Sequence, residues 1–208
     1  MITIIKAPYE PEDFSTLQQL YAKRYELFVE GRGWRGLERP DRLDIDEFDD
    51  ERTIYIIKML DGDIVGGARL RPTLEKHMLN EVFGRLCDGG RPPMGATIYE
   101  CSRTFVARRH PQRRAIFAEI LLTAAQFCVE NGVDRLTGIL ETWWLNSYLS
   151  LGLDAQPLGM PQESEGMSLL AVSFRVDREV VNTLKTRLSL LEDASARKAA
   201  EKNKLHAA

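Results

Sequence analysis

Residues 97–106 read Thr-Ile-Tyr-Glu-Cys-Ser-Arg-Thr-Phe-Val, a β-branched and aromatic run that carries two charges in its middle. The apolar composition predicts a strand, but Glu100 and Arg103 are not residues that a strand uses for packing. Two other stretches mix charge and apolar residues in the same way, residues 44–49 (DIDEFD) and 69–73 (RLRPT). Because buried charges need partners or a ligand, the three stretches together predict a polar site built on a sheet.

The pattern around this strand predicts an α/β fold. Strands are expected at residues 2–5, 53–60, 64–70, 136–140 and 169–176, and helices at 11–30, 79–86, 116–130 and 143–151. The second and third strands flank Asp61-Gly62-Asp63, which is a hairpin signal, and the helix from 116 is expected to be amphipathic. The order of a helix, antiparallel strands and then alternating strands and helices predicts a central mixed sheet with helices on its faces. Residues 34–50 show little periodicity and predict a long loop, and such loops are often functional.

The C-terminal segment predicts an appended helix. Apolar residues at 180, 181, 184, 188 and 191 form one stripe, and an Ala/Lys-rich tail follows Ala194. We expect the stripe to pack on the domain rather than to form a dimer arm, and the tail to fray. The expected units are therefore a domain over residues 1–176 and a helix with tail over 177–208, in a monomer or weak homodimer.

Composition excludes several classes of protein. The 208 residues are enough for a substantial core, and 28 basic against 31 acidic side chains give a net charge of −3, so nucleic acid is not an expected partner. The three cysteines form no CxxC pair, which fits a reducing compartment. No run is long and apolar enough to span a membrane, and Met1–Lys6 does not resemble a signal peptide, so a cytoplasmic location is expected. The three histidines are scattered, so no metal site is expected.

The aspartates of the long loop have several interpretations. Asp44, Asp46 and Asp49 could bind a hard cation, or the ammonium or sulfonium of a cationic ligand, or form a solvated acidic loop. Phe48 and Trp34 favour a cationic ligand, because aromatic faces attract cations.

The strand at 97–106 also leaves alternatives open. A regular strand places Glu100 and Ser102 on one face and Arg103 on the other, so either a bulge rotates Arg103 or the two charges serve different sides. Glu100 could be a general base if burial raises its pKa, or half of an ion pair with Arg69 or Arg103. Arg69 shares a strand face with Arg71, where both could fix a carboxylate or anchor the acidic loop. Arg24 interrupts an apolar helical stripe, which indicates a buried partner.

Two further clusters are candidates for binding. Residues 108–114 (RRHPQRR) join a strand to a helix N-terminus, where arginines and free N–H groups could bind phosphates or an acidic protein, or simply be solvated. Trp143 and Trp144 could line an apolar pocket or pack in the core.

Taken together, these residues resemble the acyl-homoserine lactone synthases of the LuxI type, the quorum-sensing autoinducer synthases. The resemblance rests on Arg24-x3-Phe28-x5-Trp34, Asp44-x-Asp46-x2-Asp49, Arg69-x-Arg71-Pro72-Thr73 and Glu100-x-Ser102-Arg103. It implies a three-layer α/β/α sandwich with a mixed sheet, like the GCN5-related N-acetyltransferases. It also implies an acyltransferase that acylates the amine of S-adenosylmethionine from a thioester and then closes the lactone, releasing methylthioadenosine, without a tightly bound cofactor.

The resemblance and the chemistry assign roles to residues. The expected catalytic residues are Glu100, Arg103, Asp46 and Arg69. The expected substrate-binding residues are Arg24, Phe28, Trp34, Asp44, Asp49, Ser102, Phe105, Thr142, Trp143 and Trp144. The expected docking residues for the thioester donor are Arg108, Arg109, Arg113 and Arg114.

Two short stretches of the sequence bear on the identity of the acyl donor and on the alternative functions. Residues 141–144 (ETWW) look like the subset of the family that uses acyl-CoA to make branched or aryl lactones, which favours acyl-CoA over acyl-acyl carrier protein. An acetyl-CoA-dependent N-acetyltransferase should show a glycine in its pyrophosphate loop, and residues 106–115 contain none. A non-catalytic sensor of a cationic metabolite is the other alternative. A metal-dependent hydrolase ranks lower.

Overall fold

The computed structural model describes residues 1–164 and 166–206, with the side chains of residues 198–206 outside the description. Its centre is a mixed sheet whose strands lie in the order β1-β2-β3-β4-β5-β8-β6, with β7 pairing with β8. The strands are β1 (Ile2–Lys6), β2 (Ile54–Leu60), β3 (Asp63–Pro72), β4 (Ile98–Val106), β5 (Arg135–Glu141), β6 (Ala155–Pro157), β7 (Gln162–Ser164) and β8 (Met167–Arg175). Among these strands only β4 and β5 pair in parallel.

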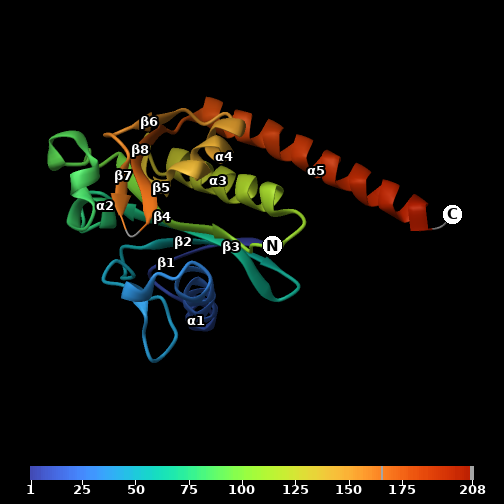
Figure 1. Cartoon of the computed structure of the whole chain (residues 1–208), viewed down its shortest axis with the longest axis horizontal. Helices are drawn as coiled ribbons and strands as arrows, with labels where there is room; N and C mark the ends of the chain where they lie inside the picture. Colours follow the sequence, from blue (N-terminus) through green and yellow to red (C-terminus); the bar gives the residue numbers. More distant parts are fainter. Residues whose placement is uncertain (165, 207–208) are drawn as a thin grey trace.

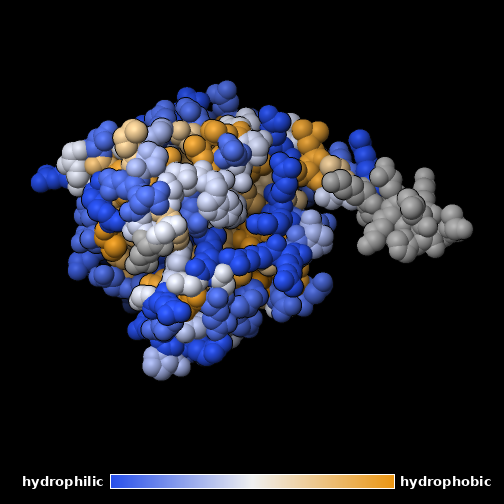
Figure 2. Space-filling model, in the orientation of Figure 1, coloured by the Kyte–Doolittle hydropathy of each residue, from blue (hydrophilic) through white to orange (hydrophobic). Residues whose placement is uncertain are grey.

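Helices cover both faces of the sheet, which confirms the predicted three-layer α/β/α sandwich. The helices are α1 (Pro11–Tyr25), α2 (Met78–Glu81), α3 (Arg113–Glu130), α4 (Leu145–Ser150) and α5 (Arg178–His206). Figure 1 shows α1 below the sheet and α3, α4 and α5 above it. Hydrophilic side chains cover most of the face seen in Figure 2, and no helix in the described ranges is long and apolar enough to cross a membrane.

The sheet is split between β4 and β5. The two strands pair only from Ile98 with Arg135 to Glu100 with Thr137, although β4 continues to Val106 and β5 to Glu141. Gly138 follows the last paired position, and a Cβ there would lie 2.7 Å from the Cys101 carbonyl oxygen. Glycine therefore allows the two backbones to approach at the point where pairing ends, and Glu100 lies at that point.

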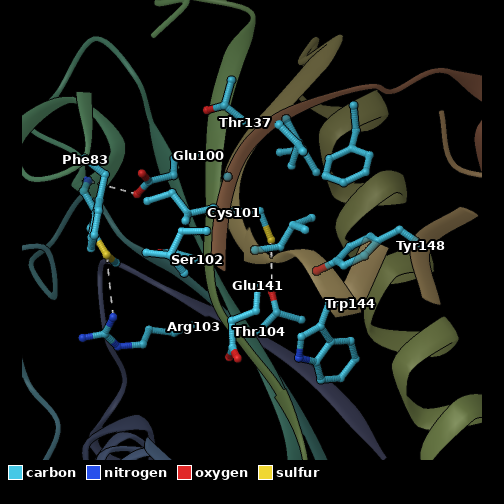
Figure 3. A pocket seen from close by; sticks show the side chains of 18 of the residues that line it. Phe83, Glu100, Cys101, Ser102, Arg103, Thr104, Thr137, Glu141, Trp144 and Tyr148 are labelled. Carbon is cyan, nitrogen blue, oxygen red and sulfur yellow. Dashed lines mark hydrogen bonds between the residues drawn. The ribbon is translucent and has the colours of Figure 1, made fainter. Parts of the chain in front are cut away.

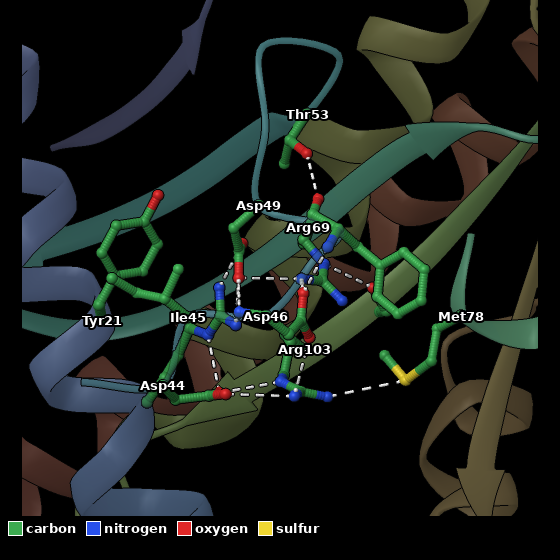
Figure 4. A network of polar contacts seen from close by, with 12 residues as sticks. Tyr21, Asp44, Ile45, Asp46, Asp49, Thr53, Arg69, Met78 and Arg103 are labelled. Atoms are coloured by element: carbon green, nitrogen blue, oxygen red, sulfur yellow. Dashed lines mark hydrogen bonds and ion pairs between the residues drawn. The ribbon is translucent and has the colours of Figure 1, made fainter. Parts of the chain in front are cut away.

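A bulge in β4 turns Arg103 onto the same side as Glu100. The register with β3 shifts between Gly67 and Arg69, and Arg103 has a left-handed φ of +51°. Arg103 contacts Asp44 and Asp46 of the loop of residues 44–50 (Figure 4), and Ser102 accepts from Arg69, which binds the same loop, as one of the two sequence-based alternatives requires. An extra residue in one strand bends it and changes which way its side chains point.

Some expected elements differ from the structure. The predicted helix 79–86 is α2 followed by a 3-10 turn at Gly84–Leu86. The expected amphipathic helix, α3, is buried on several sides because it lies between the sheet and α5. The segment after Ala194 continues α5 to His206 instead of ending the helix. Strands β6 and β7 were not predicted, since three residues are too few to establish an alternating pattern.

Candidate active site

A cavity of about 710 Å³ passes through the split in the sheet. On the α1 side it is lined by Phe28, Trp34, Asp46, Phe48, Glu100, Ser102 and Arg103. On the α3 side it is lined by Cys101, Thr104, Phe117, Leu121, Trp144 and Tyr148, several of which are labelled in Figure 3. Apart from the bulge at residues 102–103, successive side chains of β4 point to opposite faces, and both sets line one cavity. Two ligands that approach from opposite faces can therefore meet in the split.

Three arginines and three aspartates form a closed ring beside this cavity (Figure 4). Arg24 binds Asp44 at 2.9 Å and Asp49 at 2.8 Å. Arg103 binds Asp44 at 2.8 Å and Asp46 at 3.0 Å. Arg69 closes the ring through Asp46 and, at 3.1 Å, Asp49. The six formal charges cancel within the ring.

The ring bears on the expected substrate-binding role of Asp44 and Asp49, which pair with arginines and do not line the cavity. The side chains of Asp44 and Asp49 are 1% and 0% exposed, while Asp46 is 17% exposed and lines the cavity. Although burial acts to raise it, the pKa of Asp49 is held well below its ordinary value because Arg24 and Arg69 stabilise the carboxylate. Asp44 and Asp49 are therefore structural partners of arginines.

The predicted pair Arg69 and Arg71 anchors the acidic loop, which was one of the two alternatives. Arg71 donates to the Phe48 carbonyl at 2.9 Å and binds Asp50 at 2.7 Å, while Arg69 also donates to the Ser102 hydroxyl at 3.0 Å. Arg24 and Arg69 are almost fully buried and lie behind the cavity wall instead of lining it. Both guanidinium groups hold the loop through its aspartates.

Glu100 is buried and is held by backbone groups. Its carboxylate accepts hydrogen bonds from the N–H groups of Leu79 at 2.5 Å and Met78 at 3.1 Å. Within the described part of the chain it forms no ion pair, so the suggested pair with Arg69 or Arg103 is wrong. Burial raises the pKa of Glu100, and the Leu79 N–H opposes that shift only in part. The side chain is therefore suited to accept a proton.

An aromatic stack forms part of the cavity wall on the α1 side. The rings of Phe28 and Trp34 lie parallel, with centroids 5.0 Å apart. Arg103 lies 5.7 Å from the Phe28 ring and Arg32 lies 5.4 Å from it. Phe105 packs edge-on against Phe28 at 6.1 Å and supports the stack from outside the cavity.

On the α3 side, Trp144 lines the main cavity, but the two residues before it, Thr142 and Trp143, do not. Trp144 packs against Phe117 at 5.2 Å and lines the cavity, whereas Thr142 does not line it. Trp143 is 58% exposed and lines a second cavity of about 590 Å³. Burial raises the pKa of the Cys101 thiol to about 11, which agrees with a packing role.

The second cavity lies at the start of α3. It is lined by Trp143, Trp144, His110, Arg113 and Arg114. The other two predicted docking residues, Arg108 and Arg109, do not line it. Among the described residues no group of three His, Cys, Asp or Glu side chains could hold a metal ion.

Sequence reasoning missed several residues of the main cavity. Phe117, Leu121 and Tyr148 have helical spacing that is typical of ordinary core, and only the split in the sheet reveals that they line a chamber. Arg32 and Glu141 were not assigned a role, because their ion pair of 2.6 Å spans 109 positions of sequence.

The arrangement suits a transfer reaction between two substrates. A desolvated carboxylate lies where the strands separate, an aromatic and charged chamber lies on one face, and an apolar chamber lies on the other. A carboxylate with a raised pKa can take a proton from an amine as it attacks a carbonyl group held in the split.

Three comparisons relate the chain to known proteins. The family model described as autoinducer synthase matches residues 10–184. Isovaleryl-homoserine lactone synthase of Bradyrhizobium diazoefficiens is 34% identical over 176 residues, which cover 84% of this chain and 79% of that protein. The structure of the CoA-dependent acyl-homoserine lactone synthase BjaI with SAM and isopentyl-CoA has a TM-score of 0.85 and 33% identity, covering 91% of this chain and 89% of that one.

A more distant likeness concerns the fold alone. A putative N-acetyltransferase from Lactobacillus plantarum has a TM-score of 0.58 at 15% identity, covering 85% of this chain and 99% of that one. The expected likeness to N-acetyltransferases is therefore confirmed for the architecture.

Proposed function

The chain belongs to the autoinducer synthase family, and we propose that it transfers a short branched or aryl acyl group from acyl-CoA to S-adenosylmethionine and then closes the lactone. The acyl-homoserine-lactone synthase activity, an acyltransferase activity, follows from the family. The choice of donor and the roles of individual residues are the proposal. The observation that best supports acyl transfer to an amine at this site is the buried carboxylate of Glu100 at the last paired position of the split sheet.

S-adenosylmethionine fits the chamber on the α1 side. The stacked faces of Phe28 and Trp34 attract its sulfonium. Arg103, which lines the cavity, is the partner for its carboxylate, and the ring through Asp44 and Asp46 fixes the orientation of that guanidinium. The roles of Arg24, Arg69 and Asp49 are to hold this ring in place.

Glu100 acts as the general base, directly or through water. The amine nitrogen attacks the thioester carbonyl carbon, its proton passes to Glu100, and the carbon–sulfur bond breaks with the electron pair going to the CoA sulfur. The proton then passes to the thiolate. The donor carbonyl lies in the split, where N–H groups of β4 beyond Glu100 have no partner on β5 and can stabilise the oxyanion.

Lactonisation is a positioning step. The carboxylate oxygen of the acylated intermediate attacks its own γ-carbon, and the bond from that carbon to the sulfonium sulfur breaks to release methylthioadenosine. Arg103 lies 5.7 Å from the Phe28 ring, so a chamber that holds the carboxylate at Arg103 and the sulfonium at Phe28 keeps the carboxylate oxygen close to the γ-carbon. No covalent enzyme intermediate is needed.

The donor assignment is supported by the α3 side. Phe117, Trp144 and Tyr148 form an aromatic enclosure with ring centroids 5.1–5.2 Å apart, which suits a compact or flat acyl group. Arg113 and Arg114 at the second cavity offer partners for the CoA phosphates. The isovaleryl-specific name of one relative and the isopentyl-CoA bound to BjaI point the same way.

The test is mass spectrometry of the purified protein with S-adenosylmethionine and a donor panel. The panel contains isovaleryl-CoA, cinnamoyl-CoA, straight-chain acyl-CoA thioesters and the matching acyl-acyl carrier proteins. We expect a homoserine lactone and equimolar methylthioadenosine from a branched or aryl acyl-CoA. Faster turnover with the acyl carrier protein forms would contradict the donor assignment. Binding of S-adenosylmethionine without product from any donor would favour a sensor instead.

A further inference from the structure

Glu141 connects the two cavities through its two carboxylate oxygens. Oε1 accepts from Arg32 at 2.6 Å, and Oε2 accepts from the indole N–H of Trp143 at 2.7 Å. Glu141 is the last residue of β5 and lines the main cavity; Figure 3 shows it beside Thr104 and Trp144. A single side chain therefore contacts a residue from each side of the split.

Arg32 belongs to the segment that closes the α1 side. We call residues 31–37 the N-terminal lid; it carries Arg32, Trp34, Gly36 and Leu37, all of which line the main cavity. Arg32 lies 5.4 Å and 5.6 Å from the rings of Phe28 and Trp34. A ligand that orders this aromatic stack also fixes the guanidinium of Arg32.

Trp143 belongs to the other side. It lines the second cavity with Arg113 and Arg114, and Glu141 is the hydrogen-bond acceptor for its indole. The ring is 58% exposed and packs against Trp144 with centroids 4.8 Å apart, and the hydrogen bond to Glu141 holds its N–H edge. The position of Glu141 therefore influences the shape of the second cavity.

We propose that Glu141 is a positioning residue that couples the two substrate sites, so that S-adenosylmethionine bound under the N-terminal lid strengthens the binding of the acyl-CoA donor at the second cavity. The coupling passes from the aromatic stack to Arg32, then through Glu141 to Trp143. Linkage requires the effect to be reciprocal, so the donor strengthens the binding of S-adenosylmethionine by the same factor. This inference rests on the proposed function, which places S-adenosylmethionine on the α1 side of the main cavity and the CoA phosphates of the donor at the second cavity.

Burial and neighbouring charges affect the ion pair between Arg32 and Glu141. Burial lowers the pKa of Arg32, Glu141 opposes that shift, and the neighbouring charge of Arg108 adds to it. Both side chains of the pair are mostly covered, at 20% and 15% exposure, so water screens the interaction less than it would at the surface. Loss of the Glu141 charge leaves the Arg32 guanidinium without its ion-pair partner.

The experiment measures the affinity for isopentyl-CoA by calorimetry, with and without saturating S-adenosylmethionine. Isopentyl-CoA is a thioether without the reactive carbonyl, so both ligands stay intact. In the wild-type protein we expect S-adenosylmethionine to lower the Kd of isopentyl-CoA at least about fivefold. Glu141→Gln keeps an acceptor for Trp143 but loses the ion pair, and Trp143→Phe keeps the ring but loses the donor. Each variant should bring the ratio of the two Kd values close to one.

Glu119→Gln is the matched control. Glu119 forms an ion pair of 2.7 Å with Lys58, is 25% exposed, and lines neither cavity, so this variant should keep the wild-type ratio. An unchanged ratio in Glu141→Gln, or a wild-type ratio of one, would overturn the coupling. Lactone formation from isovaleryl-CoA is assayed in parallel. A wild-type protein that shows the coupling but makes no lactone contradicts the proposed function and supports the coupling.

Discussion

Asp49→Asn tests whether the arginine–aspartate ring holds the acidic loop in place. The carboxylate of Asp49 accepts from Arg24 at 2.8 and 2.9 Å, from the Tyr55 hydroxyl at 3.1 Å and from the Asp46 N–H at 3.0 Å, and its side chain is 0% exposed. Asparagine keeps the shape but replaces an acceptor oxygen by an N–H group that faces a guanidinium donor. The positive charges of the buried Arg24 and Arg69 are then only partly neutralised.

The expected loss of folding free energy in Asp49→Asn follows from the burial of the ion pair between Asp49 and Arg24. Removing one partner of a buried ion pair costs about 3–5 kcal/mol, and loss of two hydrogen bonds to a charged group, at about 1.5–3 kcal/mol each, gives a similar figure. With an m-value of about 2.5 kcal/mol/M in urea, the unfolding midpoint should fall by about 1.2–2 M. Because the folded pKa of Asp49 is depressed, this contribution to stability is present above pH ~3.9 and is lost as the pH falls toward the folded pKa.

The assay is equilibrium urea unfolding, followed by circular dichroism at pH 7 and at pH 3, where the difference between wild type and Asp49→Asn should be smaller. Glu30→Gln is the control, because Glu30 and Arg42 form an exposed ion pair with side chains 41% and 69% exposed, and its loss should cost less than about 1 kcal/mol. If Asp49→Asn at pH 7 shifts the midpoint no more than Glu30→Gln does, with an unchanged m-value, the ring is not what stabilises the loop.

Four further outcomes follow from the cavity. Glu100→Gln should lower kcat about 10²–10⁴-fold while leaving the Kd for S-adenosylmethionine nearly unchanged, and an equal loss in binding would argue against a general base. Because burial raises the pKa of Glu100, the wild-type kcat/KM should decline on acidification around a pH above ~4.3, the ordinary value for glutamate; a decline only below that value would contradict the argument. Gly138→Ala should destabilise the protein by about 1–3 kcal/mol in the same urea assay, since the new Cβ would lie 2.7 Å from the Cys101 carbonyl oxygen; a stability equal to wild type would show that the strands move apart freely. Trp144→Ala should shift the preferred donor toward longer acyl chains in competition assays, because it enlarges the α3 side, and an unchanged preference would place the acyl group elsewhere.

The fold was predictable because its signals are local. The hairpin around Asp61-Gly62-Asp63, the strand at 97–106 and the long loop at 34–50 each follow from composition over a few residues, and the structure confirms them. The buried partner of Arg24 was also predictable, because a charge within an apolar stripe needs compensation.

The site was less predictable because its geometry depends on pairing between distant segments. Alternation along β4 left two positions for Arg103, and only the register with β3 decides between them. The motif containing Trp143 and Trp144 suggested one pocket, but only Trp144 lines the main cavity, while both rings line the second one. No local sequence pattern indicates that Arg32 and Glu141 form an ion pair.

The split between β4 and β5 affects how the acyl-group specificity of such a protein can evolve. With the two substrates on opposite faces of the sheet, as proposed, the residues that contact S-adenosylmethionine and those that contact the acyl group are almost disjoint sets on alternating positions of the same strand. Substitutions at Thr104, Phe117, Leu121 or Tyr148 can alter the acyl group without disturbing the chamber that performs the chemistry. New signal molecules can therefore arise through single steps on one face, and a mutant library confined to that face is the shortest route to a synthase with a chosen product.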